Sequence, residues 1–224
     1  MSICNWPKTE RPRERLIERG PDALSDGELL AVLIGCGTRG RSAVDLARSL
    51  IDEFGSLRDF LTAEPSRCLG QPGIGPARYA SMQAALELAR RHYREPLRAR
   101  RAFKGPEAVR AFLLAQLRDR PHEVFCCLYL DHRYRLIAFE ELFRGNFDTT
   151  SVHIREVMRQ ILRRNASAVI FAHNYPSGAA EPSEADYYIT RRLRDLLLAV
   201  DVKVVDHVIV GDTKCYSFAD RGLL

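Results

Sequence analysis

The sequence predicts an all-α N-terminal domain followed by an α/β C-terminal domain, and two observations support this. Up to about residue 97, apolar residues recur at helical spacing in segments separated by serine caps and glycines. Beyond residue 106, short apolar runs alternate with helical segments, which is typical of a sheet covered by helices. The 224 residues are enough for two domains, and 46% of them are hydrophobic, enough to fill real cores.

The N-terminal part is predicted to contain three short helices and one long helix. Each short helix starts at a serine that fits an N-cap, and a glycine ends each of the first two. The four helices begin at Ser25, Ser42, Ser56 and about Ala77, and the last runs to about Tyr93. A basic stretch with little apolar content follows, and we interpret it as a linker. The predicted division is an all-α domain over 1–97, a linker over 98–105 and an α/β domain over 106–224.

The C-terminal domain is predicted to alternate strands and helices. The expected order is a helix over about 107–118, strands over 124–130 and 136–143, a helix over 153–164, a strand over 168–172, a helix over 184–200, and strands over 202–210 and 214–218. The strand over 168–172 is short and apolar, and it leads directly into the segment with the strongest functional signal.

Charge and cysteine usage indicate the general class of protein. The formal net charge of +5 permits contact with phosphate groups but does not demand it. The N-terminus has no apolar signal core, and no apolar run reaches the ~18–20 residues that span a bilayer. None of the six cysteines forms a C-x-x-C pair, which favours free thiols in a reducing compartment. We therefore expect a cytoplasmic protein with no membrane contact.

A glycine-rich turn precedes the long helix. Gly73, Ile74 and Gly75 would expose backbone N–H groups at a helix N-terminus, and Arg78 lies one turn further on. These groups suit a phosphate oxygen, and the pattern resembles a helix-hairpin-helix, a sequence-independent DNA contact. The same residues also fit an ordinary tight turn between two helices.

The segment after the strand over 168–172 carries the candidate site. Residues two apart at a strand end project to one side, so His173 and Tyr175 should face one pocket while Asn174 faces away. Asp186, in the first turn of the next helix, can point back at that pocket. Histidine and carboxylate side chains are common ligands of a catalytic zinc ion, which keeps one coordination position open for water or substrate. Alternatively, Ser183 and Asp186 form a capping box and only start their helix.

Several segments resemble a known family. The run His173-Asn174-Tyr175-Pro176-Ser177-Gly178, followed by Ser183 and Asp186, resembles the His-x-His-Pro…Ser-x-x-Asp signature of JAMM/MPN metalloproteases, which the RadC family carries as His-Asn-His-Pro-Ser-Gly. Further RadC-like segments are Arg11–Leu16, Leu24–Leu30, the turn at Gly73, Arg155–Val157 and Asp206–Gly211. The resemblance implies a cytidine-deaminase-like JAMM/MPN fold, a mixed sheet covered by helices, after a helix-hairpin-helix domain.

The resemblance also implies roles for individual residues. His173 and Asp186 match two of the three zinc ligands of the signature, and Ser183 matches the serine that supports the oxyanion. Glu123, just before the first strand, matches the glutamate that takes a proton from a zinc-bound water. Zinc lowers the pKa of such a water toward ~7, so that hydroxide can attack an amide carbonyl. The alternative for Glu123 is an ordinary exposed residue at a strand edge.

This chain departs from the signature at Tyr175, which replaces the second histidine. A phenol with a pKa of ~10 must lose a proton before it can bind zinc, so His173 and Asp186 alone should hold zinc weakly or not at all. Three explanations are open. The site is degenerate; or Tyr175 binds as a phenolate or His207 replaces it; or one substitution, natural or engineered, has disabled an active relative. His207 and Asp206 also fit an inert hydrogen-bonded pair.

Three functions follow from these patterns. The first is a zinc-dependent hydrolase of amide or isopeptide bonds, acting on a peptide or protein. The second is a DNA-associated accessory protein in repair or recombination with a metal pocket that no longer turns over. The third is a protein–protein scaffold. Zinc content of the chain, compared with a Tyr175→His variant, separates the first from the others.

Overall fold

The computed structural model describes residue 3 and the ranges 6–98, 105–145 and 153–224. The chain divides into two compact units, Met1–Leu88 and Ala89–Leu224. Each unit has its own hydrophobic core. The predicted linker over 98–105 lies almost entirely outside the described residues, so its character stays a prediction.

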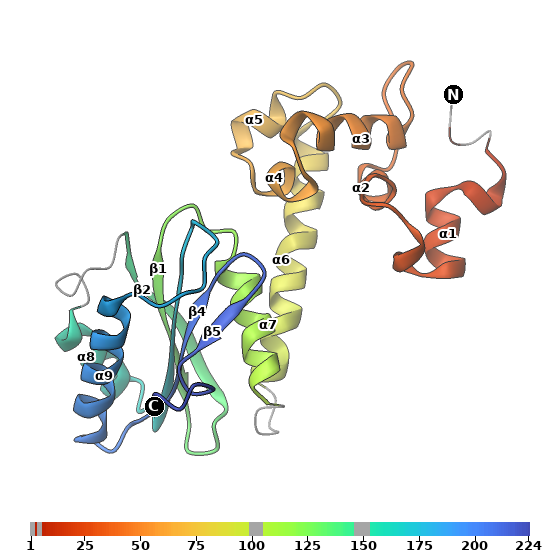
Figure 1. The fold of residues 1–224 in the computed structure, drawn as a ribbon. Helices are drawn as coiled ribbons and strands as arrows, with labels where there is room; N and C mark the ends of the chain where they lie inside the picture. The colour runs from red at the N-terminus through yellow and green to blue at the C-terminus, as the bar shows by residue number, and fades with distance from the viewer. Residues whose placement is uncertain (1–2, 4–5, 99–104, 146–152) are drawn as a thin grey trace. The chain divides into compact units, whose positions relative to one another are not determined.

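The N-terminal unit is built from helices, as predicted (Figure 1). They are two 3-10 helices at Lys8–Glu10 and Pro21–Ala23, and α1 Pro12–Arg19, α2 Asp26–Ile34, α3 Ala43–Phe54, α4 Leu57–Thr62, α5 Pro65–Leu69 and α6 Pro76–Arg98, whose last part belongs to the second unit. The predicted capping boxes at Ser25 and Ser42 are present. The sequence patterns missed α1 and α5, because each begins at a proline without a side-chain cap.

The C-terminal unit is the predicted α/β domain. Its elements are α7 Pro106–Leu117, β1 Val124–Leu130, β2 Leu136–Arg144, α8 Ile154–Arg163, β3 Ala168–Asn174, α9 Glu184–Leu198, β4 Lys203–Val210 and β5 Cys215–Ser217. The five strands form one mixed sheet in the order β2-β1-β3-β4-β5. Only β3 and β4 are parallel, and α9 is the crossover that their connection requires.

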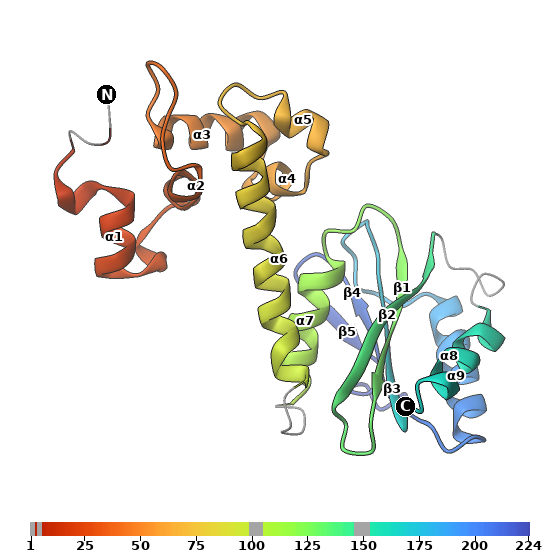
Figure 2. The ribbon, with the colours of Figure 1, turned by 180° about the vertical axis from the view of Figure 1, so that it is seen from behind.

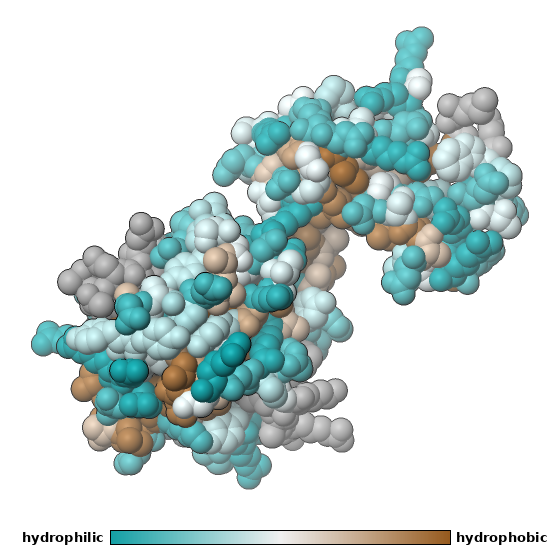
Figure 3. All heavy atoms as spheres, viewed as in Figure 1, coloured by the Kyte–Doolittle hydropathy of each residue, from teal (hydrophilic) through white to brown (hydrophobic). Residues whose placement is uncertain are grey.

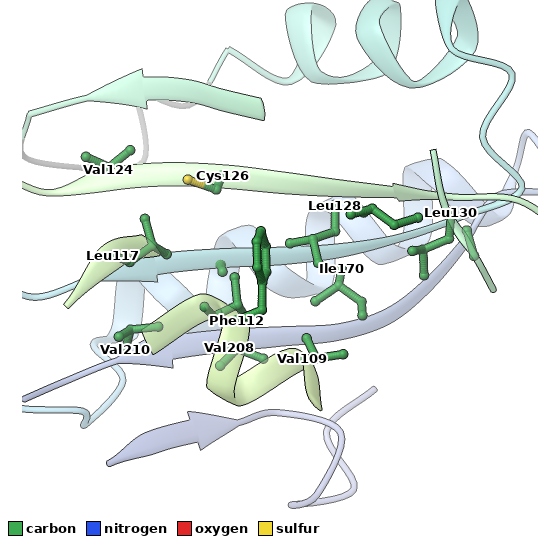
Figure 4. Packing of buried hydrophobic residues seen from close by; sticks show 14 residues of the cluster. Val109, Phe112, Leu117, Val124, Cys126, Leu128, Leu130, Ile170, Val208 and Val210 are labelled. Carbon is green, nitrogen blue, oxygen red and sulfur yellow. The ribbon is translucent and has the colours of Figure 1, made fainter. Parts of the chain in front are cut away.

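Helices cover both faces of this sheet (Figures 1 and 2). On one face α7 packs against alternate strand residues, including Cys126, Leu128 and Val208 (Figure 4). On the other face α8 and α9 pack against Cys127 and Phe171. The neighbouring Cys126 and Cys127 therefore point to opposite faces, as strand alternation predicts. The face under α8 and α9 also contains the candidate site.

The strand β3 is two residues longer than predicted. We expected it to stop at Ala172, but it continues through His173 and Asn174. His173 pairs with Phe125 of β1 on one side and with Ile209 of β4 on the other. His173 thus lies on a central strand with a backbone held from both sides, a more rigid position than the predicted loop.

The surface is mainly polar. On the face drawn in Figure 3, hydrophilic residues cover most of both units, and hydrophobic ones form scattered patches. Among the residues that the structure describes, no helix is both long and apolar enough to cross a lipid bilayer.

Candidate functional site

His173 lies at the C-terminal end of β3 and is 2% exposed. Its ring stacks on Phe125, with ring centroids 6.3 Å apart, and meets the Tyr175 ring edge-on at 5.0 Å. Burial lowers the pKa of His173 to about 4, although the nearby Asp186 charge acts in the opposite direction. At neutral pH the imidazole is therefore uncharged, and a neutral imidazole carries a proton on only one of its two ring nitrogens.

Asp186 uses its two carboxylate oxygens differently. Oδ2 accepts hydrogen bonds from Ser183 N and Ser183 Oγ, both at 2.7 Å, and these complete a capping box at the start of α9. Oδ1 lies 3.3 Å from His173 Nε2. Burial acts to raise the pKa of Asp186, but His173 and the hydrogen bonds from Tyr175 and Ser183 hold it below its usual value. Asp186 thus caps its helix and also faces the pocket.

Tyr175 occupies the third position of the signature as a neutral phenol. Its hydroxyl donates to Asp186 Oδ2 at 2.5 Å. Burial and this hydrogen bond raise the pKa of Tyr175 to about 12, and the charges of Asp186 and Glu123 act in the same direction. A phenol in this environment keeps its proton at neutral pH when no metal ion is bound.

Glu123 lies on the same face of the sheet as the His173 ring. It directly precedes β1, and strand alternation turns it to the face of Phe125, the residue paired with His173. The negative charge of Glu123 is also one of the smaller causes of the raised pKa of Tyr175. The structure therefore brings His173, Tyr175 and Asp186 into contact, and the pairing of β1 with β3 places Glu123 at the same end of the sheet.

Asn174 holds the backbone on both sides of Glu123. Its Oδ1 accepts from Val124 N at 2.9 Å, and its Nδ2 donates to the carbonyl oxygen of His122 at 3.2 Å. The side chain is 1% exposed. Sequence patterns predicted that it faces away from the pocket, but they gave no sign that it positions Glu123 across two strands.

His207 does not replace the missing ligand. Its Nε2 lies 3.0 Å from His173 Nδ1, and its Nδ1 lies 2.6 Å from Thr190 Oγ1, so both ring nitrogens are already engaged. Asp206 and His207 do form a hydrogen bond on β4, as the alternative interpretation expected, but it uses the backbone N–H of His207 and not its ring. The Asp206 carboxylate accepts from this N–H and from Ser217 Oγ, both at 2.7 Å.

The donor set fits a metal ion at two positions out of three. His173 Nε2 and Asp186 Oδ1 are basic atoms that converge, as ligands of one ion do. At the third position Tyr175 presents a neutral hydroxyl. Within the described ranges, no three His, Cys, Asp or Glu side chains are grouped closely enough to hold a metal ion. The Ser183 hydroxyl is directed at Asp186, so oxyanion support would require it to rotate.

The predicted DNA-contact turn lies between α5 and α6. Ile74 is buried in the N-terminal core, and Gly73 has a φ of +88°. Arg78 donates to the carbonyl oxygens of Gly73 and Cys36, so its guanidinium holds the turn together. Gly75 is exposed, and a Cβ placed there would meet no atom within 4 Å. The turn thus has a structural role in this unit, and a DNA contact there stays a prediction.

A helical N-terminal unit, followed by a mixed sheet with a histidine–aspartate pair at the end of β3, defines a protein with a C-terminal JAB-type α/β domain. The RadC-like JAB domain model matches residues 103–223, and the UPF0758 N-terminal model matches residues 3–80. The chain therefore belongs to the RadC-like JAB domain family of UPF0758 proteins, as the sequence motifs predicted.

Full-length relatives agree with this assignment. UPF0758 proteins of Nitrosococcus oceani, Thioalkalivibrio sulfidiphilus and Halorhodospira halophila are 53%, 56% and 54% identical to this chain over 224 residues. Each alignment covers 100% of both proteins. The similarity therefore extends along the whole length of the chain.

Proposed function

We propose that the C-terminal domain is a metal-dependent amide hydrolase whose metal site is weakened in this chain by Tyr175. One observation carries the proposal: His173 Nε2 and Asp186 Oδ1 lie 3.3 Å apart. Strand alternation turns Glu123 to the same face of the sheet. A neutral imidazole and two carboxylates at one strand end form a set typical of metal-assisted hydrolysis.

Each side chain has a distinct role in this proposal. His173 and Asp186 would hold a zinc ion, which when bound supplies a Lewis acid and lowers the pKa of a coordinated water toward ~7. Glu123 accepts the proton from the attacking water and passes it to the leaving amine. Ser183 keeps Asp186 in position through two hydrogen bonds to Oδ2. Tyr175 competes for Asp186 through that same oxygen and contributes no free donor atom.

Peptidase activity of the Tyr175→His variant tests this proposal. Zinc-loaded Tyr175→His protein is incubated with a degenerate peptide library, and new termini are identified by mass spectrometry. We expect cleavage that falls about 100-fold or more when Glu123→Gln is added, because a positioned general base contributes about 10²–10⁴ in rate. His122→Gln, at the exposed neighbouring position, serves as the matched control. Cleavage that survives Glu123→Gln, or no cleavage by any zinc-loaded variant, contradicts the proposal and favours a scaffold.

DNA binding through the turn before α6 is a second candidate function. The observation that favours it is the exposure of Gly75 at the start of a 23-residue helix, where the first backbone N–H groups have no partner within the helix. An exposed glycine lets a phosphate approach these donors closely. The Arg78 guanidinium already donates to backbone carbonyl oxygens, so a DNA phosphate would be bound by backbone N–H groups and not by this side chain.

Gly75→Glu tests the DNA proposal without altering the turn itself. The new side chain enters open space, so the fold should persist while its negative charge repels phosphate. We expect Gly75→Glu to weaken binding to a short DNA duplex about tenfold or more, and Gly75→Ala to weaken it far less. Affinity of the unmodified chain should fall steeply as salt is added. Equal binding by the glutamate variant, or binding that salt does not change, would rule out this contact.

A further inference from the structure

Three buried side chains form a hydrogen-bonded series that ends at the candidate metal ligand. Thr190 on α9, His207 on β4 and His173 on β3 are all at most 2% exposed. Thr190 Oγ1 lies 2.6 Å from His207 Nδ1, and His207 Nε2 lies 3.0 Å from His173 Nδ1. Because all three are almost fully buried, the protein supplies the partners within the series.

The partner of Thr190 determines the direction of every proton in the series. Thr190 Oγ1 also lies 2.5 Å from the carbonyl oxygen of Asp186, and a carbonyl can only accept. The single hydroxyl proton of Thr190 is therefore used on Asp186. His207 Nδ1 must then donate to Thr190 Oγ1. The opposite direction would leave two oxygens 2.5 Å apart with no proton between them.

The remaining protons follow from the neutral form of each ring. His207 is stacked on Phe218, with ring centroids 5.1 Å apart, and is 0% exposed, which favours an uncharged imidazole. A neutral His207 protonated on Nδ1 has a lone pair on Nε2. His173 must therefore donate from Nδ1 to His207 Nε2, and its own Nε2 is left as a lone pair.

We propose that Thr190 and His207 are positioning residues that fix His173 as the Nδ1–H tautomer. This inference concerns the same site as the proposed function, and the use of the tautomer in metal binding rests on that function. The fixed tautomer leaves the lone pair on Nε2, the nitrogen that lies 3.3 Å from Asp186 Oδ1. This is the form in which His173 can bind a metal ion on the Asp186 side of the ring. A metal-binding histidine commonly donates its other N–H to a partner that sets its tautomer.

Ring-nitrogen NMR of the metal-free full chain tests the tautomer directly. Histidine is labelled with 15N, the His173 signals are assigned with a His173→Gln variant, and long-range 1H–15N spectra identify the protonated nitrogen. We expect Nδ1–H for His173 in the unmodified chain and in Thr190→Ser, which keeps the hydroxyl. Thr190→Val removes it, so His207 should change tautomer and His173 should become protonated on Nε2. An Nε2–H tautomer in the unmodified chain, or no change in Thr190→Val, overturns the proposal.

Zinc affinity measured in the Tyr175→His background separates this inference from the proposed function. Competition with a chelating dye should show that Thr190→Val weakens zinc binding about 10- to 100-fold in this background. Thr190→Ser, which keeps the hydroxyl, should leave the zinc affinity unchanged. Unchanged affinity in the valine variant overturns the positioning role. If Tyr175→His itself binds no zinc while the NMR result is as expected, the tautomer assignment stands and the hydrolase proposal fails.

Discussion

Replacing Tyr175 with histidine is expected to raise the zinc content from well below one equivalent to near one equivalent per chain. In the unmodified protein, His173 and Asp186 supply two donors, and the third position is a phenol whose pKa is raised to about 12. An imidazole at position 175 needs no deprotonation at neutral pH and completes a three-ligand set. It also frees Asp186 Oδ2 from one hydrogen bond. Elemental analysis by mass spectrometry after dialysis against limiting zinc gives the stoichiometry.

Tyr175→Phe is the matched control for this result. Phenylalanine keeps the ring that packs against His173 but removes the oxygen. If Tyr175 were a phenolate ligand, this variant would bind less zinc than the unmodified chain. We expect equal or slightly greater binding, because the loss of the hydroxyl frees Asp186. Full zinc occupancy in the unmodified protein would be inconsistent with a weakened site.

Gly73→Ala is expected to destabilise the N-terminal unit by several kcal/mol. The residue has a φ of +88°, and a left-handed conformation costs a non-glycine residue roughly 1–2 kcal/mol. The added Cβ would also lie 2.7 Å from Thr38 Cγ2 and 2.9 Å from Leu46 Cδ2, and overpacking costs about 1–3 kcal/mol more. The single tryptophan, Trp6, packs against this core, so its fluorescence during urea unfolding reports the loss.

Gly75→Ala provides the comparison, because it changes the same turn without a clash. A Cβ at this position meets nothing within 4 Å, and the residue has no positive φ. We expect its unfolding free energy to stay within about 0.5 kcal/mol of the unmodified chain. Equal urea midpoints for Gly73→Ala and the unmodified protein would show that the turn tolerates a side chain at both glycines. Because Gly73→Ala perturbs the fold, loss of DNA binding in that variant alone would not identify a contact.

Local signals predicted most of the fold. The serine caps at Ser25 and Ser42 and the apolar strands of the C-terminal domain placed elements where the structure has them. The end of β3 was misplaced, because polar residues such as His173 and Asn174 rarely occupy a central strand. Asn174 Oδ1 is bonded by Val124 N of β1, and His173 Nδ1 lies 3.0 Å from His207 Nε2 of β4. No pattern within β3 itself reveals those partners.

The part of the site whose residues are close together in the chain was also predictable from local signals. Tyr175, Ser183 and Asp186 are close in the chain, and a short motif brings them together. Thr190 and His207 reach His173 only through the parallel pairing of β3 with β4 and the packing of α9. Such contacts depend on the tertiary structure, so spacing along the chain suggested a ligand role for His207 that the geometry does not support.

The most direct test of the central claim, that His173 and Asp186 form one metal site completed by position 175, is anomalous X-ray scattering. Crystals of the zinc-loaded Tyr175→His variant are measured on both sides of the zinc absorption edge. The account predicts one strong peak about 2.0–2.2 Å from His173 Nε2 and from an Asp186 carboxylate oxygen. A peak elsewhere, or none at these residues in fully loaded protein, would contradict it.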